Sequence, residues 1–230
     1  MVLSHMVIAW WDILPMWLIY PMYAAGGLTF PIMAYFVVEG YKHTSNLKKY
    51  ILRLLTFGLI ALPFHILTLG FPLANGDPSV YPWLNIMFTI ILSLLVLIMY
   101  DKIKVRAIFW LIYVFLIVPI AFMFFEWGFF GTTTVLLFYI IRNENARRIV
   151  PPILAGIFNI VPVLLLMLTI DTMESAQGLA YDIDFIRLMP TFAIGCFLVA
   201  LLLKNYNGER GKQMKWLFYA AYPPILLYFL

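Results

Sequence analysis

Long apolar stretches separated by short polar segments dominate the sequence. They lie at about residues 1–22, 26–41, 54–74, 83–100, 107–125, 127–141, 149–169, 187–203 and 216–230. A helix needs roughly 20 residues to cross the hydrocarbon core of a membrane, so most of these stretches can cross once. The second and the sixth are shorter and require flanking residues or tilt. The pattern predicts an all-α fold, a polytopic membrane helical bundle with about nine transmembrane helices.

Composition favours the same fold class. Of the 230 residues, 64% are apolar and 11% are charged. Soluble domains are about half apolar and about a quarter charged. The longest polar loop, residues 171–187, is too short to fold alone. The sequence therefore predicts one integral membrane domain, residues 1–230, surrounded by the lipid bilayer.

The basic residues predict the sides of the membrane on which the loops lie. Fourteen of the fifteen Lys and Arg residues fall in alternate loops, at residues 42–53, 102–106, 142–148 and 204–215. Positively charged loops stay in the cytoplasm, so nine crossings place the N-terminus in the cytoplasm and the C-terminus outside. The net charge of +4 follows this membrane pattern. We therefore expect a multi-pass protein of the cytoplasmic membrane with no nucleic-acid partner.

The segment FPIMAYFVVEGYKHT, residues 30–44, ends an apolar stretch with an acid and a histidine. Glu39 and His43 are four residues apart and would share one face of a helix. In a functional interpretation, the carboxylate orients the imidazole and raises its basicity, so that the pair acts as a general base. In a structural interpretation, the pair closes a helix end at the membrane interface, with Lys42 among the headgroups. Spacing alone leaves both interpretations open.

Other polar residues lie inside or beside apolar stretches, where ionisable groups are costly and usually face a cavity or a partner. His65 follows Pro63, which is expected to kink its helix. This histidine either lines a cavity or bonds a carbonyl group that the proline leaves free. Asn85 and Thr89 are four residues apart, and an asparagine in hydrocarbon usually bonds a neighbouring helix. Glu126 falls in a predicted two-residue outer turn, where a solvated side chain is the default.

Several kinds of site are excluded because their motifs are absent. The sequence has no Walker loop, no Gly-x-Gly-x-x-Gly after a strand, no His-Glu-x-x-His and no Cys-x-x-Cys. The three histidines and the single Cys196 lie in separate stretches, so we expect no metal site. His5, taken alone, is a residue of a frayed N-terminus.

Five segments, taken together and in order, resemble the TraX family of multispanning membrane proteins. FPIMAYFVVEGYKHT resembles the family's hallmark run, which ends in Val-Glu-Gly-Phe and is followed by His-Thr. KKYILRLL resembles its Lys-Tyr-Leu-Leu-Arg-Leu segment, and NIMFT resembles its Asn-Val-Phe-Phe-Thr segment. EWGFFG resembles an Asp-Tyr-Gly-x-x-Gly stretch, and KWLFYAAYPP resembles a Lys-Tyr-x-Phe-Tyr-x-x-Tyr-Pro ending. The matches span about residues 4–224.

The resemblance implies a membrane-embedded acyltransferase of the bacterial cytoplasmic membrane that uses acetyl-CoA as its acyl donor. By family precedent the acceptor is the N-terminal amine of a pilin, although an amine or hydroxyl of another peptide, a lipid or a glycan also fits the sequence. His5 matches a first-helix histidine that is often essential in multispanning acyltransferases. Together with Glu39 and His43, it forms the predicted catalytic set.

The resemblance also implies binding roles. Lys49 and Arg53 match the family's basic segment and are expected to pair with the phosphates of CoA. Asn85 is expected to steady a developing oxyanion, a role worth about 3 kcal/mol. The predicted substrate-binding and CoA-binding residues are Lys49, Arg53, His65, Asn85, Thr89 and Glu126.

Three features depart from the family pattern. Ser4 replaces the aspartate that usually precedes the first histidine, IALPF lacks a preceding Ser-Glu pair, and the ending lacks a histidine after Tyr-Pro. The acyltransferase interpretation also leaves two alternatives open. One is a non-catalytic polytopic membrane protein, such as a small transporter or an assembly or immunity factor. The other is a membrane transferase that takes its group from a lipid-linked donor.

Overall fold

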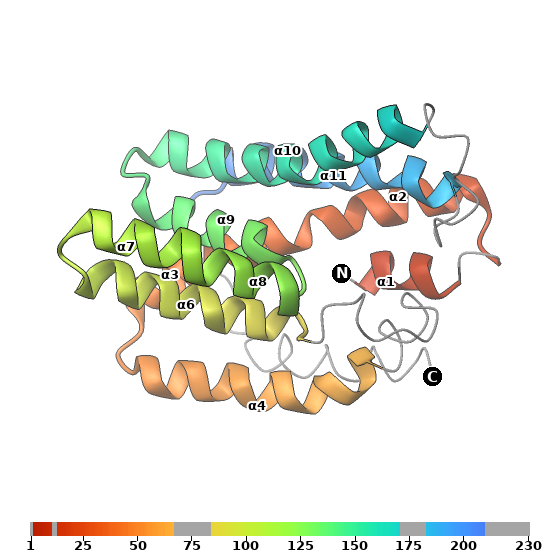
Figure 1. Ribbon diagram of the computed structural model, residues 1–230. Helices are drawn as coiled ribbons and strands as arrows, with labels where there is room; N and C mark the ends of the chain where they lie inside the picture. Colours follow the sequence, from red (N-terminus) through yellow and green to blue (C-terminus); the bar gives the residue numbers. More distant parts are fainter. Residues whose placement is uncertain (1, 11–12, 67–83, 171–182, 210–230) are drawn as a thin grey trace. The chain divides into compact units, whose positions relative to one another are not determined.

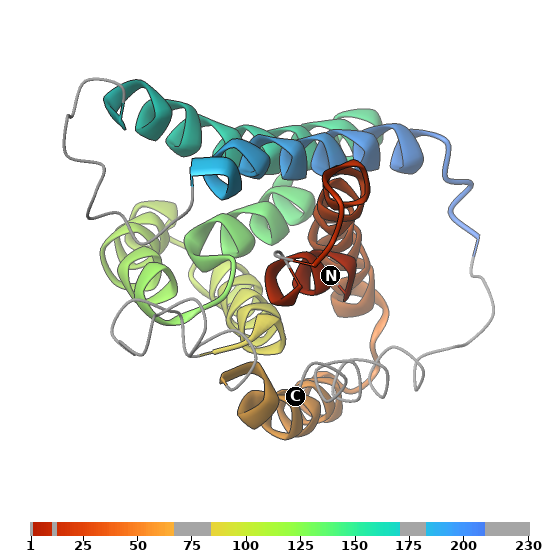
Figure 2. The ribbon, with the colours of Figure 1, turned by 90° about the vertical axis from the view of Figure 1, so that its right-hand side faces the viewer.

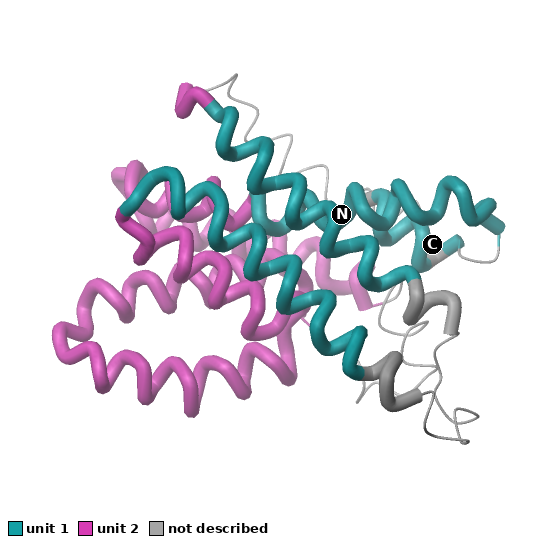
Figure 3. The backbone as a smooth tube through the Cα atoms, turned by 90° about the horizontal axis from the view of Figure 1, so that it is seen from above, with its two compact units in different colours: residues 1–32, 143–206 teal, residues 33–142, 207–230 magenta. Residues whose placement is uncertain are grey.

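The computed structural model describes residues 2–10, 13–66, 84–170 and 183–209. Within these ranges every regular element is a helix, and the one β-type pairing is an isolated bridge between Leu84 and Phe125. The predicted all-α fold is therefore confirmed. The chain forms two compact units, which Figure 3 colours separately. Unit 1 comprises residues 1–32 and 143–206, and unit 2 comprises residues 33–142 and 207–230. The expectation of a single domain stays a prediction.

Unit 1 contains a pair of long helices, α10 (Glu144–Ile170) and α11 (Ile183–Lys204), which lie side by side (Figures 1 and 2). The Arg148 guanidinium, near the start of α10, donates a hydrogen bond of 2.9 Å to the Tyr206 carbonyl oxygen, just beyond α11. The start of one helix therefore meets the end of the other, and the pair is antiparallel.

A third helix, α2 (Met16–Gly27), packs closely against α11 because glycines line the contact. A Cβ atom at Gly27 would overlap the carbonyl oxygen of Phe192, and one at Gly195 would overlap that of Ala24. The Cys196 thiol donates to the Gly27 carbonyl oxygen at 3.3 Å. Small residues allow two helix backbones to approach in this way, as they do in membrane bundles.

The predicted first crossing, residues 1–22, is wrong as a single helix. α1 (Val2–Ala9) is followed by a turn in which the Leu14 N–H donates to the Trp10 carbonyl oxygen. α2 begins after Pro15, which has no N–H and cannot continue a helix from the preceding residues. The eight residues of α1 rise only about 12 Å, which is well short of the hydrocarbon core.

α1 instead folds back on α2. Val7 is buried in a cluster with Ile19, Met22 and Tyr23 of α2. Ser4 sits so close to Gly26 that a Cβ atom there would collide with the serine side chain. The apolar character of residues 1–22 therefore arises from a short hairpin of two helices.

The predicted boundary between the first two crossings is also displaced. α3 (Thr29–His43) follows α2 directly, and Leu28 between them has a helical backbone. Residues 16–43 together form one candidate membrane span of 28 residues. Gly26 and Gly27, at the predicted start of the second stretch, instead lie at the end of α2, where Gly26 meets Ser4 of α1 and Gly27 meets α11.

Unit 2 is built from helices that run back and forth between its two ends (Figure 1). The helices are α3, α4 (Leu47–His65), α6 (Ile86–Lys102), α7 (Arg106–Ile112), α8 (Val118–Phe124) and α9 (Gly128–Ile140). α4 begins seven residues before the predicted start at 54, because the Asn46 side chain caps it by accepting the Lys49 N–H at 2.8 Å.

The core of unit 2 lies between α6 and α9. Ile86, Ile90, Leu94 and Leu97 recur at helical spacing on α6 and are almost fully buried. On α9, the residues Val135, Leu136 and Phe138 are buried as well. The two helices pack against each other over this apolar surface.

A π-helical turn, Tyr113–Ile117, joins α7 to α8. The N–H of Val118 donates to the Tyr113 carbonyl oxygen five residues back, and the next residue, Pro119, has no N–H to donate. The wider turn absorbs this missing donor, so residues 106–124 remain one continuous apolar span. The Tyr113 hydroxyl in this turn lies between those of Thr132 and Thr133 on α9, at 3.2 and 2.8 Å.

Three helical segments in the described ranges are long and apolar enough to cross a membrane: Met16–His43, Arg106–Phe124 and Glu144–Leu165. Gly128–Ile140 and Leu188–Lys204 are shorter apolar helices. The last predicted stretch, residues 216–230, lies outside the described residues. The structure thus supports a membrane protein, and the count of nine crossings stays a prediction.

Replacing Gly195 with valine should destabilise unit 1 by about 3 kcal/mol or more, because the new side chain would meet the α2 backbone, which cannot rotate away. The midpoint of thermal unfolding in detergent, followed by tryptophan fluorescence, measures the effect. Ile194→Val, at an exposed position next to it on α11, is the matched control and should change stability by less than about 0.5 kcal/mol. Equal midpoints for the two variants would contradict the close packing of α2 on α11.

Candidate functional site

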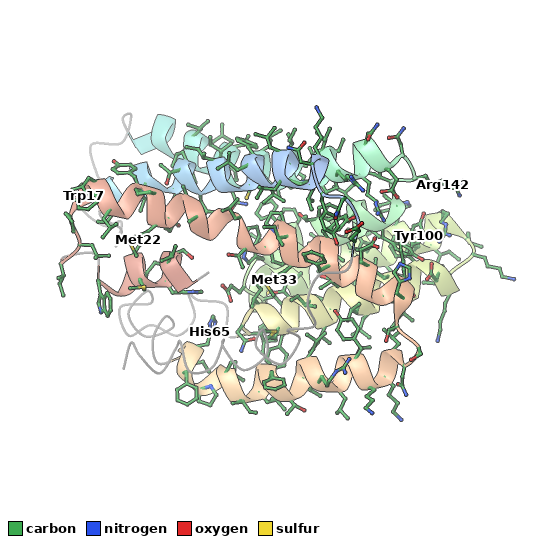
Figure 4. The ribbon with its side chains drawn as sticks, turned by 180° about the vertical axis from the view of Figure 1, so that it is seen from behind. Trp17, Met22, Met33, His65, Tyr100 and Arg142 are labelled. Atoms are coloured by element: carbon green, nitrogen blue, oxygen red, sulfur yellow. The ribbon has the colours of Figure 1, made fainter. Side chains whose placement is uncertain are left out.

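Polar side chains gather at both ends of unit 2. We call residues 65, 84–89 and 125–128 the His65 end, and residues 39–53, 100–106 and 139–142 the basic end. Figure 4 shows His65 at one end of the unit and Tyr100 and Arg142 at the other. Each end carries a pair formed by a histidine and a glutamate.

His65 is the last residue of α4, and its side chain is fully buried. Its Nδ1 atom lies 4.0 Å from the Oε2 atom of Glu126, whose side chain is 17% exposed. This separation is longer than a hydrogen bond, but it brings the two groups within reach of an ion pair when the imidazole is protonated. α4 continues through Pro63, so that the proline does not end the helix before the histidine.

Glu126 occupies a tight turn between α8 and α9, as predicted. The turn reverses the chain because Trp127 and Gly128 both adopt positive φ angles, of 66° and 45°. The Glu126 N–H donates to the Leu84 carbonyl oxygen at 2.9 Å. The Thr89 hydroxyl donates to the Glu126 carbonyl oxygen at 2.8 Å. One chain segment, residues 84–89, therefore holds both the N–H and the carbonyl oxygen of this acid.

The Glu126 carboxylate is held by the start of α6. The backbone N–H of Ile86 donates to its Oε2 atom at 2.9 Å. This N–H belongs to the first turn of a helix, where the backbone donors have no partner within the helix and carry a partial positive charge. A carboxylate is therefore a favourable acceptor at this position.

Asn85 joins the same helix end to α4. Its side-chain oxygen accepts the Met87 N–H at 3.0 Å and so caps α6. Its amide nitrogen donates to the Gly58 carbonyl oxygen at 2.9 Å. These two hydrogen bonds give Asn85 a structural task, as expected for an asparagine between membrane helices. They also engage the side-chain oxygen of Asn85 and one of the two hydrogens of its side-chain amide.

The structure therefore brings four of the predicted binding residues together: His65, Asn85, Thr89 and Glu126. Only the imidazole and the carboxylate have the chemistry of an acid or a base. A histidine whose one nitrogen faces a carboxylate can take a proton on its other nitrogen, and the carboxylate then stabilises the imidazolium. Asn85, Thr89 and Ile86 position the carboxylate.

At the basic end, Glu39 and His43 share one face of α3, as their spacing predicts. The His43 Nε2 atom lies 3.6 Å from the Glu39 Oε2 atom, and the Lys42 Nζ atom lies 3.9 Å from Oε1. The His43 side chain is 78% exposed. The Lys42 ammonium group and the His43 imidazole thus share one carboxylate near the surface, in contrast to the buried pair at the His65 end.

A second carboxylate at the basic end was not anticipated from the sequence. Asp101, near the end of α6, accepts the Tyr41 hydroxyl on Oδ2 and the Tyr139 hydroxyl on Oδ1, each at 2.7 Å. These bonds tie the ends of α3, α6 and α9 together. Arg106 covers the neighbouring Tyr100 ring at 3.9 Å from its centroid. The only signal in the sequence was the acid in the segment YDKIK, which resembles an ordinary polar loop.

All eight Lys and Arg residues in the described part of unit 2 lie at this end. They are Lys42, Lys48, Lys49, Arg53, Lys102, Lys104, Arg106 and Arg142. Lys49 and Arg53, the predicted phosphate ligands, are four residues apart and share one face of α4. The Arg53 guanidinium lies 6.0 Å from the centre of the Tyr50 ring.

The two ends are separated by about a helix length. From Ile86 to Asp101, α6 rises about 23 Å. Asn85 is therefore far from Glu39 and His43, and one bound group cannot contact it together with that pair. His5 belongs to unit 1, where its side chain is buried in α1. Within the described residues, no group of three or more His, Cys, Asp or Glu side chains is arranged to hold a metal ion.

Comparison with known proteins supplies the family. A family model described as "TraX protein" matches residues 1–230. The chain belongs to the TraX family. It is also 28% identical over 215 residues to "Probable fimbrial assembly protein FimC, serogroup H1" of Dichelobacter nodosus, and the match covers 86% of this chain and 77% of that relative. No solved structure matches it significantly.

Two of the segments by which the sequence resembles the TraX family meet at the His65 end. NIMFT, residues 85–89, supplies the start of α6, and EWGFFG, residues 126–131, supplies the turn that carries Glu126. The segments are distant in the sequence and are joined by the hydrogen bonds of Ile86 and Thr89. In this TraX protein, these two segments thus form one structural assembly.

Replacing Asn85 with alanine should cost about 2–3 kcal/mol, because α6 loses its cap and the Gly58 carbonyl oxygen loses its donor. Thermal unfolding in detergent measures this change. Asn205→Ala removes a single bond from an exposed asparagine to the Leu201 carbonyl oxygen and should change stability by no more than about 0.5 kcal/mol. A loss for Asn85→Ala as small as that of the control would contradict the structural role of Asn85.

Proposed function

We propose that this TraX protein is a membrane-embedded acyltransferase that transfers an acetyl group from acetyl-CoA to an amine or hydroxyl group. The observation that carries the proposal is the buried His65–Glu126 pair, held in place by segments characteristic of the family. The name of the relative, a probable fimbrial assembly protein, favours a peptide subunit with a free N-terminal amine as the acceptor. The protein would act in the bacterial cytoplasmic membrane as a multi-pass protein.

The orientation follows from the charges of unit 2. Basic loops stay in the cytoplasm, so the basic end would face the cytoplasm and the His65 end the opposite side. Because residues 16–43 form one span, Met16 would then lie on the outer side, and α1 would fold back from there. In this proposal the basic loops of unit 2 stay in the cytoplasm, as predicted. The N-terminus, however, no longer lies on the predicted cytoplasmic side.

His65 is the general base in this proposal. The acceptor nitrogen or oxygen attacks the carbonyl carbon of the thioester, and its proton passes to His65. The carbon–sulfur bond then breaks, and the CoA thiolate leaves and takes up a proton. Glu126 stabilises the imidazolium that forms in between. General-base assistance of this kind contributes about 10²–10⁴-fold to the rate.

The basic end is assigned to the charged part of the donor. Lys49 and Arg53 on α4 would pair with the phosphates of CoA, and the start of α4 adds a partial positive charge. Glu39 and His43, which the sequence predicts as a catalytic pair, would line this donor site. The exposed His43 shares its carboxylate with Lys42, so it is less suited to be the base than the buried His65. His5 keeps the role implied by the family as a prediction.

His65→Gln should lower kcat about 100-fold or more, because glutamine cannot take up the proton. Glu126→Gln should lower kcat as well, while Arg53→Ala should raise KM for acetyl-CoA with a smaller effect on kcat. Mass spectrometry of an acetylated peptide with a free N-terminus, formed by purified protein in detergent, measures these constants. Glu144→Gln, at an exposed position in unit 1, is the control and should retain full activity.

Two results would overturn parts of this proposal. If His43→Gln abolished turnover while His65→Gln did not, the base would be the Glu39–His43 pair. If folded protein neither bound acetyl-CoA at millimolar concentration nor acetylated any peptide, the non-catalytic alternative, a membrane factor of pilus assembly, would replace the enzyme.

The orientation is tested by cysteine labelling. In a Cys196→Ala background, Lys104→Cys should react with a membrane-impermeant maleimide only in inverted membrane vesicles. Trp127→Cys should react only in right-side-out vesicles, because positions 104 and 127 lie at opposite ends of unit 2. Labelling of both positions from the same side would contradict the proposed crossing of unit 2.

A further inference from the structure

The distance between the two ends has a consequence for the reaction. From Lys49 to His65, α4 rises about 24 Å, and α6 covers nearly the same distance between Ile86 and Asp101. The hydrocarbon core of a bilayer is about 30 Å thick. If unit 2 spans the membrane, the basic residues and the His65–Glu126 pair lie near its opposite faces.

The charges at the two ends suit different ligands. The eight Lys and Arg residues in the described part of unit 2 are all at the basic end. A ligand with several phosphates therefore matches the basic end better, since no Lys or Arg among the described residues of the unit lies at the His65 end. The ionisable groups at that end are an imidazole and the Glu126 carboxylate, which attracts a protonated amine.

Access to the His65 end also differs between its two members. His65 is fully buried, whereas Glu126 is 17% exposed and lies in a turn rather than within a helix. Of the two groups, the Glu126 carboxylate is therefore the more accessible. This arrangement suits the capture of an ammonium group by Glu126 and the removal of its proton by the adjacent His65 imidazole.

We propose that the acceptor enters from the membrane face opposite the basic end, so that the acetyl group leaves the donor's face and is transferred to a molecule on the other face. The inference rests on the proposed acyltransferase function. The phosphates of CoA remain at Lys49 and Arg53, and its long uncharged arm carries the thioester toward His65. At His65, a new nitrogen–carbon bond forms, the carbon–sulfur bond breaks, the amine proton passes to the imidazole, and the thiolate takes up a proton.

Sealed proteoliposomes test the sidedness. Acetyl-CoA is added outside, and a short peptide with a free N-terminal amine is placed either only inside or only outside. Only molecules whose basic end faces outward meet the donor. We expect at least tenfold more acetylated peptide when the peptide is inside. The same peptide with a blocked N-terminus and liposomes without protein are the controls for specificity and leakage.

Detergent-solubilised protein separates this inference from the function on which it rests. In detergent both faces are open, so acetylation is expected from a single mixture. If detergent gives product and vesicles give it only with donor and peptide on the same side, the transfer across the membrane is overturned and the acyltransferase stands. No product in detergent would overturn both. Product in detergent and from the trapped peptide would support both.

Discussion

The N-terminus of α6 is the feature on which the His65 end depends. Its backbone N–H groups have no partners within the helix, and in an apolar environment each unsatisfied polar group costs several kcal/mol. The Ile86 N–H meets this requirement through the Glu126 carboxylate, and the Met87 N–H meets it through the side-chain oxygen of Asn85. The Asn85 side-chain amide also donates to the Gly58 carbonyl oxygen. Satisfying one helix end thus fixes the position of α4, of α6 and of the turn before α9. The same contacts place an acid beside His65.

The components of this site were predictable from the sequence, but their association was not. His65, Asn85, Thr89 and Glu126 stand out because polar residues in apolar surroundings need a partner. Their actual partners are mostly backbone groups, such as the Ile86 N–H and the Gly58 carbonyl oxygen, which leave no trace in residue identity. The imidazole and the carboxylate also come from segments on either side of α6, α7 and α8 in the sequence, so no helical spacing relates them. Glu39 and His43 were easier to pair, because one helix turn connects them.

Helix boundaries were predictable where an apolar stretch ends in charges, as at both ends of α9. They were wrong near the N-terminus, where apolarity does not distinguish a turn from a helix. Trp10, Ile13 and Leu14, which lie between α1 and α2, are themselves apolar. Gly26 and Gly27, at the predicted start of the second stretch, instead lie at the end of α2, where they are needed for packing. Asp101 was missed for a related reason. Its role depends on Tyr41 and Tyr139 from two other helices, and only the fold brings those hydroxyls to it.

The separation of the two ends follows from solvation rather than from the chemistry of the reaction. Lys and Arg carry permanent charges that must stay near water, so several of them can gather only at a membrane surface. An imidazole can be neutral, and a single carboxylate can be held by a helix N-terminus, so His65 and Glu126 need no cluster of basic residues around them. A donor that binds through phosphates must then keep its reactive group far from its charges to serve this site. Acetyl-CoA has that form, because a long uncharged arm joins its phosphates to its thioester, and this match favours it over a donor whose charges adjoin the transferred group.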